Sequence, residues 1–112
     1  MEVMITSSPF GSRTRTRALL ALRLLGESYP RELARLLGAP LSSVQKALAS
    51  LERDGLVAAR PVGRTRAFRL EPRYFAHEAL GRYLERLAEP EEDLRGRVAA
   101  LRRRPRRTAK PL

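Results

Sequence analysis

Apolar side chains recur at helical spacing in two neighbouring segments near the middle of the chain. The segment over residues 30–37 carries Leu33, Leu36 and Leu37. The segment over residues 41–53 carries Val44, Ala47, Leu48 and Leu51. Such spacing places each set on one face of an amphipathic helix, and Gly38-Ala39-Pro40 between them suits the end of one helix and the start of the next. This order predicts a helix-turn-helix, whose second helix is the candidate reader of a DNA groove.

A strand pattern follows Gly55, which is predicted to end the second helix. Residues 56–60 and 67–70 are predicted to form two short strands. Residues 61–66 between them contain Pro and Gly, the residues that mark a turn. Arginines lie in and beside this hairpin, at Arg60, Arg64, Arg66 and Arg69. The pattern therefore predicts a hairpin with a basic tip.

One further helix is predicted before this unit and two after it. Residues 10–25 have Ser12 as a candidate N-cap and an almost continuous apolar run, which belongs in the middle of a small core. Residues 73–88 carry a wide apolar stripe that begins at Phe75, and part of it is expected to cover the core. Residues 90–101 carry a narrower stripe, which predicts docking on a second subunit or another domain. The predicted dimerisation residues are Tyr83, Leu84, Leu87, Leu94, Val98 and Leu101.

The net charge of +11 indicates an anionic polymer as partner. Residues 102–112 carry six basic side chains and no acid, while the rest of the chain holds 17 basic and 12 acidic side chains. The end of the chain is therefore predicted to be a disordered tail that contacts phosphates without sequence preference. Of the 23 basic residues 21 are Arg, which binds phosphate and guanine in a bidentate way. A GC-rich genome, whose codons favour Arg, would produce the same excess of Arg over Lys. The absence of Cys and Asn is typical of a thermophilic source.

The chain from residue 31 to residue 70 resembles the winged helix-turn-helix domain of bacterial transcriptional regulators of the ArsR/MarR type. The matching pieces are ELARLLG for the first helix, SSVQKAL for the recognition helix, LERDGLV for the entry into the wing and VGRTRAFRL for the wing hairpin. The upstream FGSRTRTRALLALRLL is similar to the first helix of winged helices found near minimal nucleotidyltransferases. Over residues 10–75, the resemblance implies a mainly α fold with a small β-hairpin wing. It also implies binding of double-stranded DNA by a homodimer.

Four regions are expected on these grounds. They are a flexible N-terminus over residues 1–9, the winged helix-turn-helix over 10–72, C-terminal dimerisation helices over 73–101, and the disordered basic tail over 102–112. A dimeric regulator of this kind, with no apolar run of membrane-spanning length and no secretory signal, is expected in the cytoplasm with the nucleoid.

The predicted DNA-binding residues lie on the two helices, the wing and the tail. They are Arg31, Ser42, Ser43, Gln45, Lys46, Arg60, Arg64, Thr65, Arg66, Arg102, Arg103 and Arg104. Gln45 can bond adenine and Lys46 can reach guanine or phosphate, whereas Ser42 and Ser43 could equally serve as helix caps. The wing is expected on the minor groove or its phosphates. These side chains provide little direct readout of the base sequence, so specificity is expected to depend on DNA shape, the wing and the spacing of the two subunits.

The sequence offers no catalytic set and no metal-binding set. No Cys and a single His exclude a thiolate or His-rich metal site, so no cofactor is expected and a thiol-based metal sensor is excluded. FGSR is similar to the glycine-serine motif of nucleotidyltransferases, but that motif needs an Asp pair shortly downstream and the next Asp is Asp54. The alternatives to a regulator are a non-specific architectural nucleic-acid-binding protein and the DNA-binding partner of a toxin–antitoxin-like nucleotidyltransferase pair. The sequence does not identify a small-molecule effector and does not exclude one.

Overall fold

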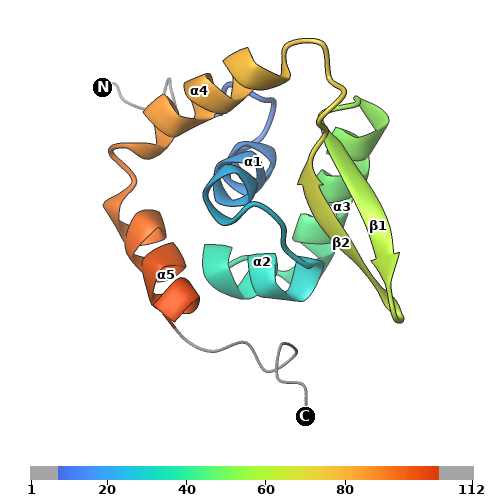
Figure 1. Ribbon diagram of the computed structural model, residues 1–112. Coiled ribbons are helices and arrows are strands. Elements are labelled where there is room, and N and C mark those ends of the chain that lie inside the picture. Colours follow the sequence, from blue (N-terminus) through green and yellow to red (C-terminus); the bar gives the residue numbers. More distant parts are fainter. Residues whose placement is uncertain (1–7, 104–112) are drawn as a thin grey trace.

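The computed structural model describes residues 8–103 (Figure 1). In chain order the elements are α1 (Arg13–Leu25), α2 (Pro30–Leu37), α3 (Leu41–Arg53), β1 (Val57–Val62), β2 (Thr65–Leu70), α4 (His77–Ala88) and α5 (Glu92–Arg103). The predicted fold class, mainly α with a hairpin after the third helix, is confirmed. No helix within this range is long and apolar enough to cross a membrane.

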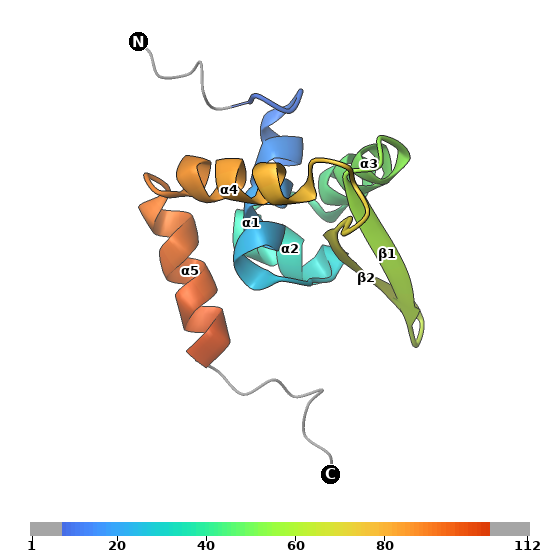
Figure 2. The same cartoon turned by 45° about the horizontal axis from the view of Figure 1, so that its top comes forward.

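Helix α1 forms the centre of the core, as its apolar run predicts. Every residue of Ala18–Leu22 is buried, which requires neighbours on all sides of the helix. Those neighbours are α2, α3, α4, α5 and β2, which surround α1 in both views (Figures 1 and 2). The Oγ of Ser12 accepts a hydrogen bond from the backbone N of Arg15 at 3.1 Å. Ser12 is therefore the N-cap, and the helix begins at Arg13 rather than at Phe10.

The helix-turn-helix is formed by α2 and α3, and its turn depends on Gly38. This residue has φ +64°, in the left-handed region. Its N–H donates to the carbonyl of Arg35, and the next N–H, of Ala39, donates to that of Ala34 at 3.0 Å. These bonds satisfy the last carbonyls of α2 in the way typical of a glycine-terminated helix. The predicted apolar faces of the two helices are buried, namely Leu33, Leu36, Leu37, Val44, Ala47, Leu48 and Leu51.

Replacing Gly38 by alanine is expected to lower the free energy of unfolding by about 1–2 kcal/mol, because a Cβ is strained at positive φ. Gly96 is the matched control, since it lies inside α5 and an added Cβ there meets nothing within 4 Å. Replacing Gly96 by alanine is expected to stabilise the chain by about 0.5–1 kcal/mol. Urea unfolding of both variants measures this difference, and equal effects would contradict the role of the left-handed turn.

The wing hairpin is longer than the predicted strands 56–60 and 67–70. Strands β1 and β2 pair antiparallel up to a two-residue turn formed by Gly63 and Arg64. Gly63 has φ +62°, a backbone conformation that short hairpin turns use and that glycine adopts without strain. Pro61 lies inside β1, and an edge strand of a two-stranded hairpin tolerates its missing N–H. Proline therefore does not end the strand where the sequence pattern predicts an end.

A short backbone bridge ties the wing to the start of α2. The N–H of Ser28 donates to the carbonyl of Phe68 at 3.0 Å, and the N–H of Phe68 donates back to Ser28 at 2.7 Å. The Ser28 side chain is buried, and its hydroxyl donates to Oε1 of Glu32 in α2 at 2.6 Å. The bridge sets the wing at a defined place beside the helix-turn-helix.

Helix α4 begins later than the predicted range 73–88, at His77. Glu71 holds the preceding residues in a turn: its carboxylate accepts from the backbone N of Arg73 at 3.0 Å, and its carbonyl lies 3.0 Å from Nδ1 of His77. Such local bonds compete with helix formation. Phe75 consequently lies before the helix and is 93% exposed, so it does not belong to the apolar stripe.

Three of the predicted dimerisation residues are instead part of the core of the single chain. Leu84 and Leu94 are fully buried, and Val98 is 4% exposed. Helix α5 packs on α1, α2 and α4 of its own chain, so its narrow stripe is covered without a second subunit. The assignment of these three side chains to a dimer surface is corrected accordingly, and Tyr83, Leu87 and Leu101 keep exposed surface.

The end of α5 also differs from the prediction. Arg102 and Arg103, which the charge pattern assigned to a disordered tail, form the last turn of α5. Arg104 and the rest of the predicted tail over residues 104–112 lie outside the described residues, as do residues 1–7 of the predicted flexible N-terminus.

Candidate nucleic-acid interface

Helix α3 presents a polar face to solvent and an apolar face to the core, as its periodicity predicts. The exposed residues of that face are Ser42, Gln45, Lys46 and Ala49. Ser43 is half-buried, and Pro40 occupies the N-cap position without a side-chain cap bond. Within the described residues neither serine therefore caps α3, which leaves their hydroxyls available to a ligand.

A groove between α3 and the wing brings several predicted residues together. It encloses about 320 Å³ and is lined by Pro30, Gln45, Leu48, Ala49, Arg64, Thr65, Arg66 and Phe68. Gln45 contributes from the helix, and Arg64, Thr65 and Arg66 contribute from the turn and β2. Arg31 follows Pro30 in the first turn of α2 and is exposed. One concave surface therefore carries an amide, a hydroxyl and guanidinium groups, with the positive end of α2 beside it.

Arg60 of β1 is held by a carboxylate of its own chain. Its Nε donates to Oε2 of Glu27 at 2.8 Å and its Nη2 donates to Oε1 at 3.0 Å, a bidentate pair. The hydrogen bond from Arg60 holds the pKa of the Glu27 carboxyl below its ordinary value, against a smaller opposing effect of burial. The same contact raises the pKa of Arg60. Both groups therefore stay charged across the physiological pH range.

Arg66 of β2 is held by a carboxylate of α3 through one hydrogen bond. Its Nη2 donates to Oε2 of Glu52 at 2.7 Å, and its guanidinium carbon lies 5.1 Å from the centre of the Phe68 ring. Among residues 8–103, neither Arg64 nor Arg69 takes part in an ion pair. Two wing arginines, Arg60 and Arg66, are therefore paired with a carboxylate, and the other two are not. The sequence pattern did not predict this division, because it did not identify Glu27 and Glu52 as partners.

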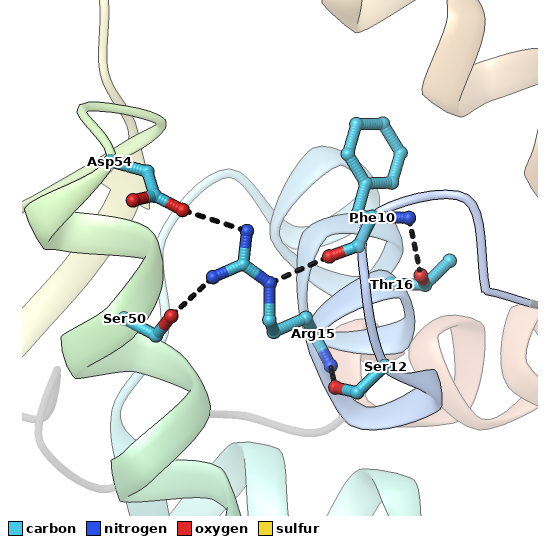
Figure 3. Close-up of polar contacts among 6 residues, drawn as sticks. All are labelled: Phe10, Ser12, Arg15, Thr16, Ser50 and Asp54. Atoms are coloured by element: carbon cyan, nitrogen blue, oxygen red, sulfur yellow. Dashed lines mark hydrogen bonds and ion pairs between the residues drawn. The ribbon is translucent and has the colours of Figure 1, made fainter.

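Arg15 fixes the far end of α3 against α1 (Figure 3). Its Nε donates to the carbonyl of Phe10 at 2.6 Å, its Nη1 bonds the hydroxyl of Ser50, and its Nη2 lies 2.9 Å from a carboxylate oxygen of Asp54. Ser50 lies in the last turn of α3 and Asp54 directly follows the helix, four residues later, so one planar guanidinium spans both. Arg15 therefore ties the C-terminal end of α3 to the start of α1.

Two further arginines hold the end of α2. Arg17 of α1 donates to the carbonyl of Leu37 at 3.0 Å, and Arg97 of α5 donates to the carbonyl of Leu36 at 2.8 Å. Cationic donors satisfy carbonyls that the end of a helix leaves unpaired. Arg17 and Arg97 therefore attach the C-terminal end of α2 to α1 and α5.

Comparison with known families decides the identity of this domain. Residues 12–66 match the model of the MarR family, a span that runs from the N-cap of α1 into β2. This chain belongs to the MarR family. It is a DNA-binding transcriptional regulator of a non-enzymatic family, as the resemblance implied. No curated protein matches.

Solved structures share the fold of this MarR-family chain. A probable transcriptional regulator from Pseudomonas aeruginosa aligns with a TM-score of 0.55 and 23% identity, over 87% of this chain and 83% of that chain. The adhesin competence repressor AdcR from Streptococcus pyogenes aligns with a TM-score of 0.58 and 17% identity, over 91% of this chain and 75% of that chain. At these identities the likeness concerns the fold.

The fold of the MarR-family regulator separates its predicted DNA-binding residues into groups. The groove collects Gln45, Arg64, Thr65 and Arg66, and the exposed face of α3 adds Ser42 and Lys46. Arg102 and Arg103 lie on α5, across α1 and α2 from the hairpin (Figures 1 and 2). A ligand that fills the groove would therefore meet α3 and the wing together.

Proposed function

We propose that this regulator inserts α3 into the major groove of duplex DNA and lays its wing on the flanking minor groove or backbone. The observation that carries this proposal is the groove in which Gln45 of α3 faces the same space as Arg64 and Thr65 of the wing. A single duplex that enters the groove contacts both elements. This is the docking arrangement of a helix-turn-helix, with a base-reading helix and phosphate contacts that set its register.

Each side chain has a role that follows from its chemistry. Gln45 offers an amide that can pair with both polar atoms of an adenine edge, and Lys46 reaches guanine or phosphate. Ser42 and Ser43 at the start of α3 bond either base edges or phosphate. Arg31 and the N-terminus of α2 bind a phosphate, because unpaired N–H groups and the helix dipole favour an anion there. The exposed arginines of the wing add phosphate contacts on this duplex, whereas Arg102 and Arg103 lie on α5 away from the groove, and Arg102 donates to the carbonyl of Leu24.

The proposal includes a homodimer that acts on DNA in the cytoplasm. Support comes from apolar surface that one chain leaves open: Tyr83 is 47% exposed and Leu87, one turn later in α4, is half-buried. Leu101 at the end of α5 is also half-buried. A two-fold pair of recognition helices matches an inverted repeat with half-sites one helical turn, or a multiple of it, apart.

Selection of bound fragments from random duplex DNA tests the proposal. The selection is run at low salt and again at about 0.3 M salt, where phosphate contacts alone no longer hold a duplex. A recovered inverted repeat at the higher salt would support a sequence-specific dimer, and its spacing would measure the separation of the recognition helices. Binding that has no motif and disappears with salt would instead support the non-specific architectural alternative.

Alanine variants of the groove are expected to separate base reading from phosphate binding. Gln45→Ala is expected to relax the preference at one base position, at a cost of about 1–3 kcal/mol for the preferred base. Arg64→Ala is expected to weaken binding to all duplexes alike and to reduce the slope of log K against log salt by about 0.9. Titration of labelled duplexes by fluorescence anisotropy measures both effects.

Arg73→Ala is the matched control for Arg64→Ala. The Arg73 side chain is 92% exposed and lies 3.8 Å from Glu71, outside the lining of the groove. The control removes the same charge and is expected to leave affinity nearly unchanged. If both variants weakened binding equally, net charge rather than the groove would account for the interaction.

A further inference from the structure

Two carboxylates outside the lining of the groove hold arginines of the wing, the element that the proposed function places against DNA. Glu52 follows Gln45 by seven residues and Ala49 by three, so helical spacing puts it on the same side of α3 as the groove. Glu27 lies in the loop before α2 and faces the outer strand of the wing through its pair with Arg60. A carboxylate beside a phosphate backbone is repelled, so both positions are unusual in a DNA-binding surface.

Each carboxylate occupies the donors that a phosphate would need. Glu27 takes both the Nε and one Nη of Arg60, which is the edge of the guanidinium that also binds phosphate in a bidentate way. Glu52 takes one Nη of Arg66, while the Phe68 ring beneath the guanidinium restricts where it can turn. Each pair carries no net charge, and Arg69 also interacts electrostatically with Glu27, so Arg64 is the groove arginine that offers its full charge to DNA.

These pairs can open in exchange for phosphate. The side chains of Arg60 and Arg66 are 58% and 53% exposed, and exposed ion pairs contribute little to stability because water and salt screen them. A phosphate that enters the groove therefore competes with Glu52 for Arg66, and a phosphate that lies along the outer strand of the wing competes with Glu27 for Arg60. The protein loses part of the gain from each new phosphate contact when it releases the old partner.

We propose that Glu27 and Glu52 set the DNA affinity of this regulator by holding Arg60 and Arg66 on the protein. They act as positioning residues that reduce binding to arbitrary DNA, and the inference rests on the proposed function of the groove. Removing either carboxylate frees one arginine for phosphate and removes one repulsive charge. The wing thereby discriminates between duplexes whose backbone can displace the carboxylates and duplexes whose backbone cannot.

The test compares Glu52→Gln, Glu27→Gln and the double variant with the wild-type full chain. The probe is a random-sequence DNA duplex, titrated by fluorescence anisotropy between about 50 and about 200 mM KCl. Each single variant is expected to bind roughly three- to tenfold more tightly at the lower salt and to steepen the slope of log K against log salt by about 0.9. The double variant is expected to show about twice the change in slope.

Glu85→Gln is the matched control. Glu85 of α4 pairs with Arg23 of α1 at 2.6 Å, its side chain is 54% exposed, and neither partner lines the groove. If this control tightened binding as much as Glu52→Gln, net charge would explain the result and the proposal would be wrong. Weaker binding by Glu52→Gln would also overturn it, because the carboxylate would then be holding Arg66 in a productive position.

The outcomes separate this inference from the function on which it rests. A wild-type chain that binds no duplex at low salt would overturn the proposed function and the inference together. Wild-type binding with unchanged affinity and slope in all the glutamine variants would overturn the inference alone. Thermal unfolding followed by circular dichroism verifies that each variant is folded at the temperature of the titration.

Discussion

Replacing Leu84 by alanine is expected to lower the free energy of unfolding by about 2–5 kcal/mol. Leu84 is fully buried between α4 and the rest of the core. Truncation removes the favourable transfer of its side chain from water and leaves a cavity that close-packed neighbours fill only in part. Since small domains are stable by about 5–15 kcal/mol, this variant is expected to lose a large share of the total. Urea unfolding followed by circular dichroism measures the loss.

Tyr83→Ala provides the contrast, because Tyr83 precedes Leu84 in α4 and is 47% exposed. It packs against Phe10, with ring centres 5.9 Å apart, and its loss is expected to cost about 0.5–1.5 kcal/mol. Sedimentation velocity of both variants at several protein concentrations tests association, since a dimer makes stability depend on concentration. If Leu84→Ala left unfolding unchanged and abolished association instead, Leu84 would belong to a dimer surface and not to the core.

Replacing Arg15 by methionine is expected to lower the free energy of unfolding by about 2 kcal/mol. Methionine keeps a stem of similar length but removes the guanidinium that joins Phe10, Ser50 and Asp54 (Figure 3). The Arg15 side chain is only 19% exposed, so the loss leaves partly buried acceptors without a donor. Asp54 is 53% exposed and adds little to this figure. Urea unfolding of the variant provides the measurement.

Arg13→Met removes the same charge from the same end of α1 and serves as control. Arg13 is exposed, and its replacement is expected to change stability by less than about 0.5 kcal/mol. A double-mutant cycle of Arg15→Met with Ser50→Ala isolates the contact between α1 and α3. An interaction energy near zero would mean that Arg15 acts on α1 alone and does not orient the recognition helix.

The sequence predicts the helix-turn-helix well because its signals are local. The apolar faces of α2 and α3 follow from spacing within a few residues, and Gly38 marks the turn by a backbone preference of its own. The Ser12 cap is equally local. The start of α4 was predicted four residues too early because Phe75 matches the helical spacing, while the competing bonds of Glu71 involve both its side chain and its carbonyl.

The division of apolar residues between core and outer surface could not be predicted. Leu84 and Tyr83 belong to one apolar stripe in the sequence, yet one is fully buried and the other is half-exposed. Leu94 and Val98 are covered because α5 turns back onto α1 and α2 of the same chain. Periodicity identifies a face that needs a partner, but it contains no information on which element provides that partner.

The partners of the arginines are likewise a property of the tertiary structure. Arg15 meets Ser50 across 35 residues of sequence, and Arg60 meets Glu27 across 33. Net charge predicted a basic DNA-binding protein, and the positions of the arginines in the sequence predicted a basic wing. By itself, then, the sequence determined the helix-turn-helix, the hairpin and the preference for an anionic polymer, because these depend on local spacing and on summed charge. Only the tertiary structure decided which arginines are paired with a carboxylate of the protein and which are not, since an ion pair depends on distances between elements that folding brings together.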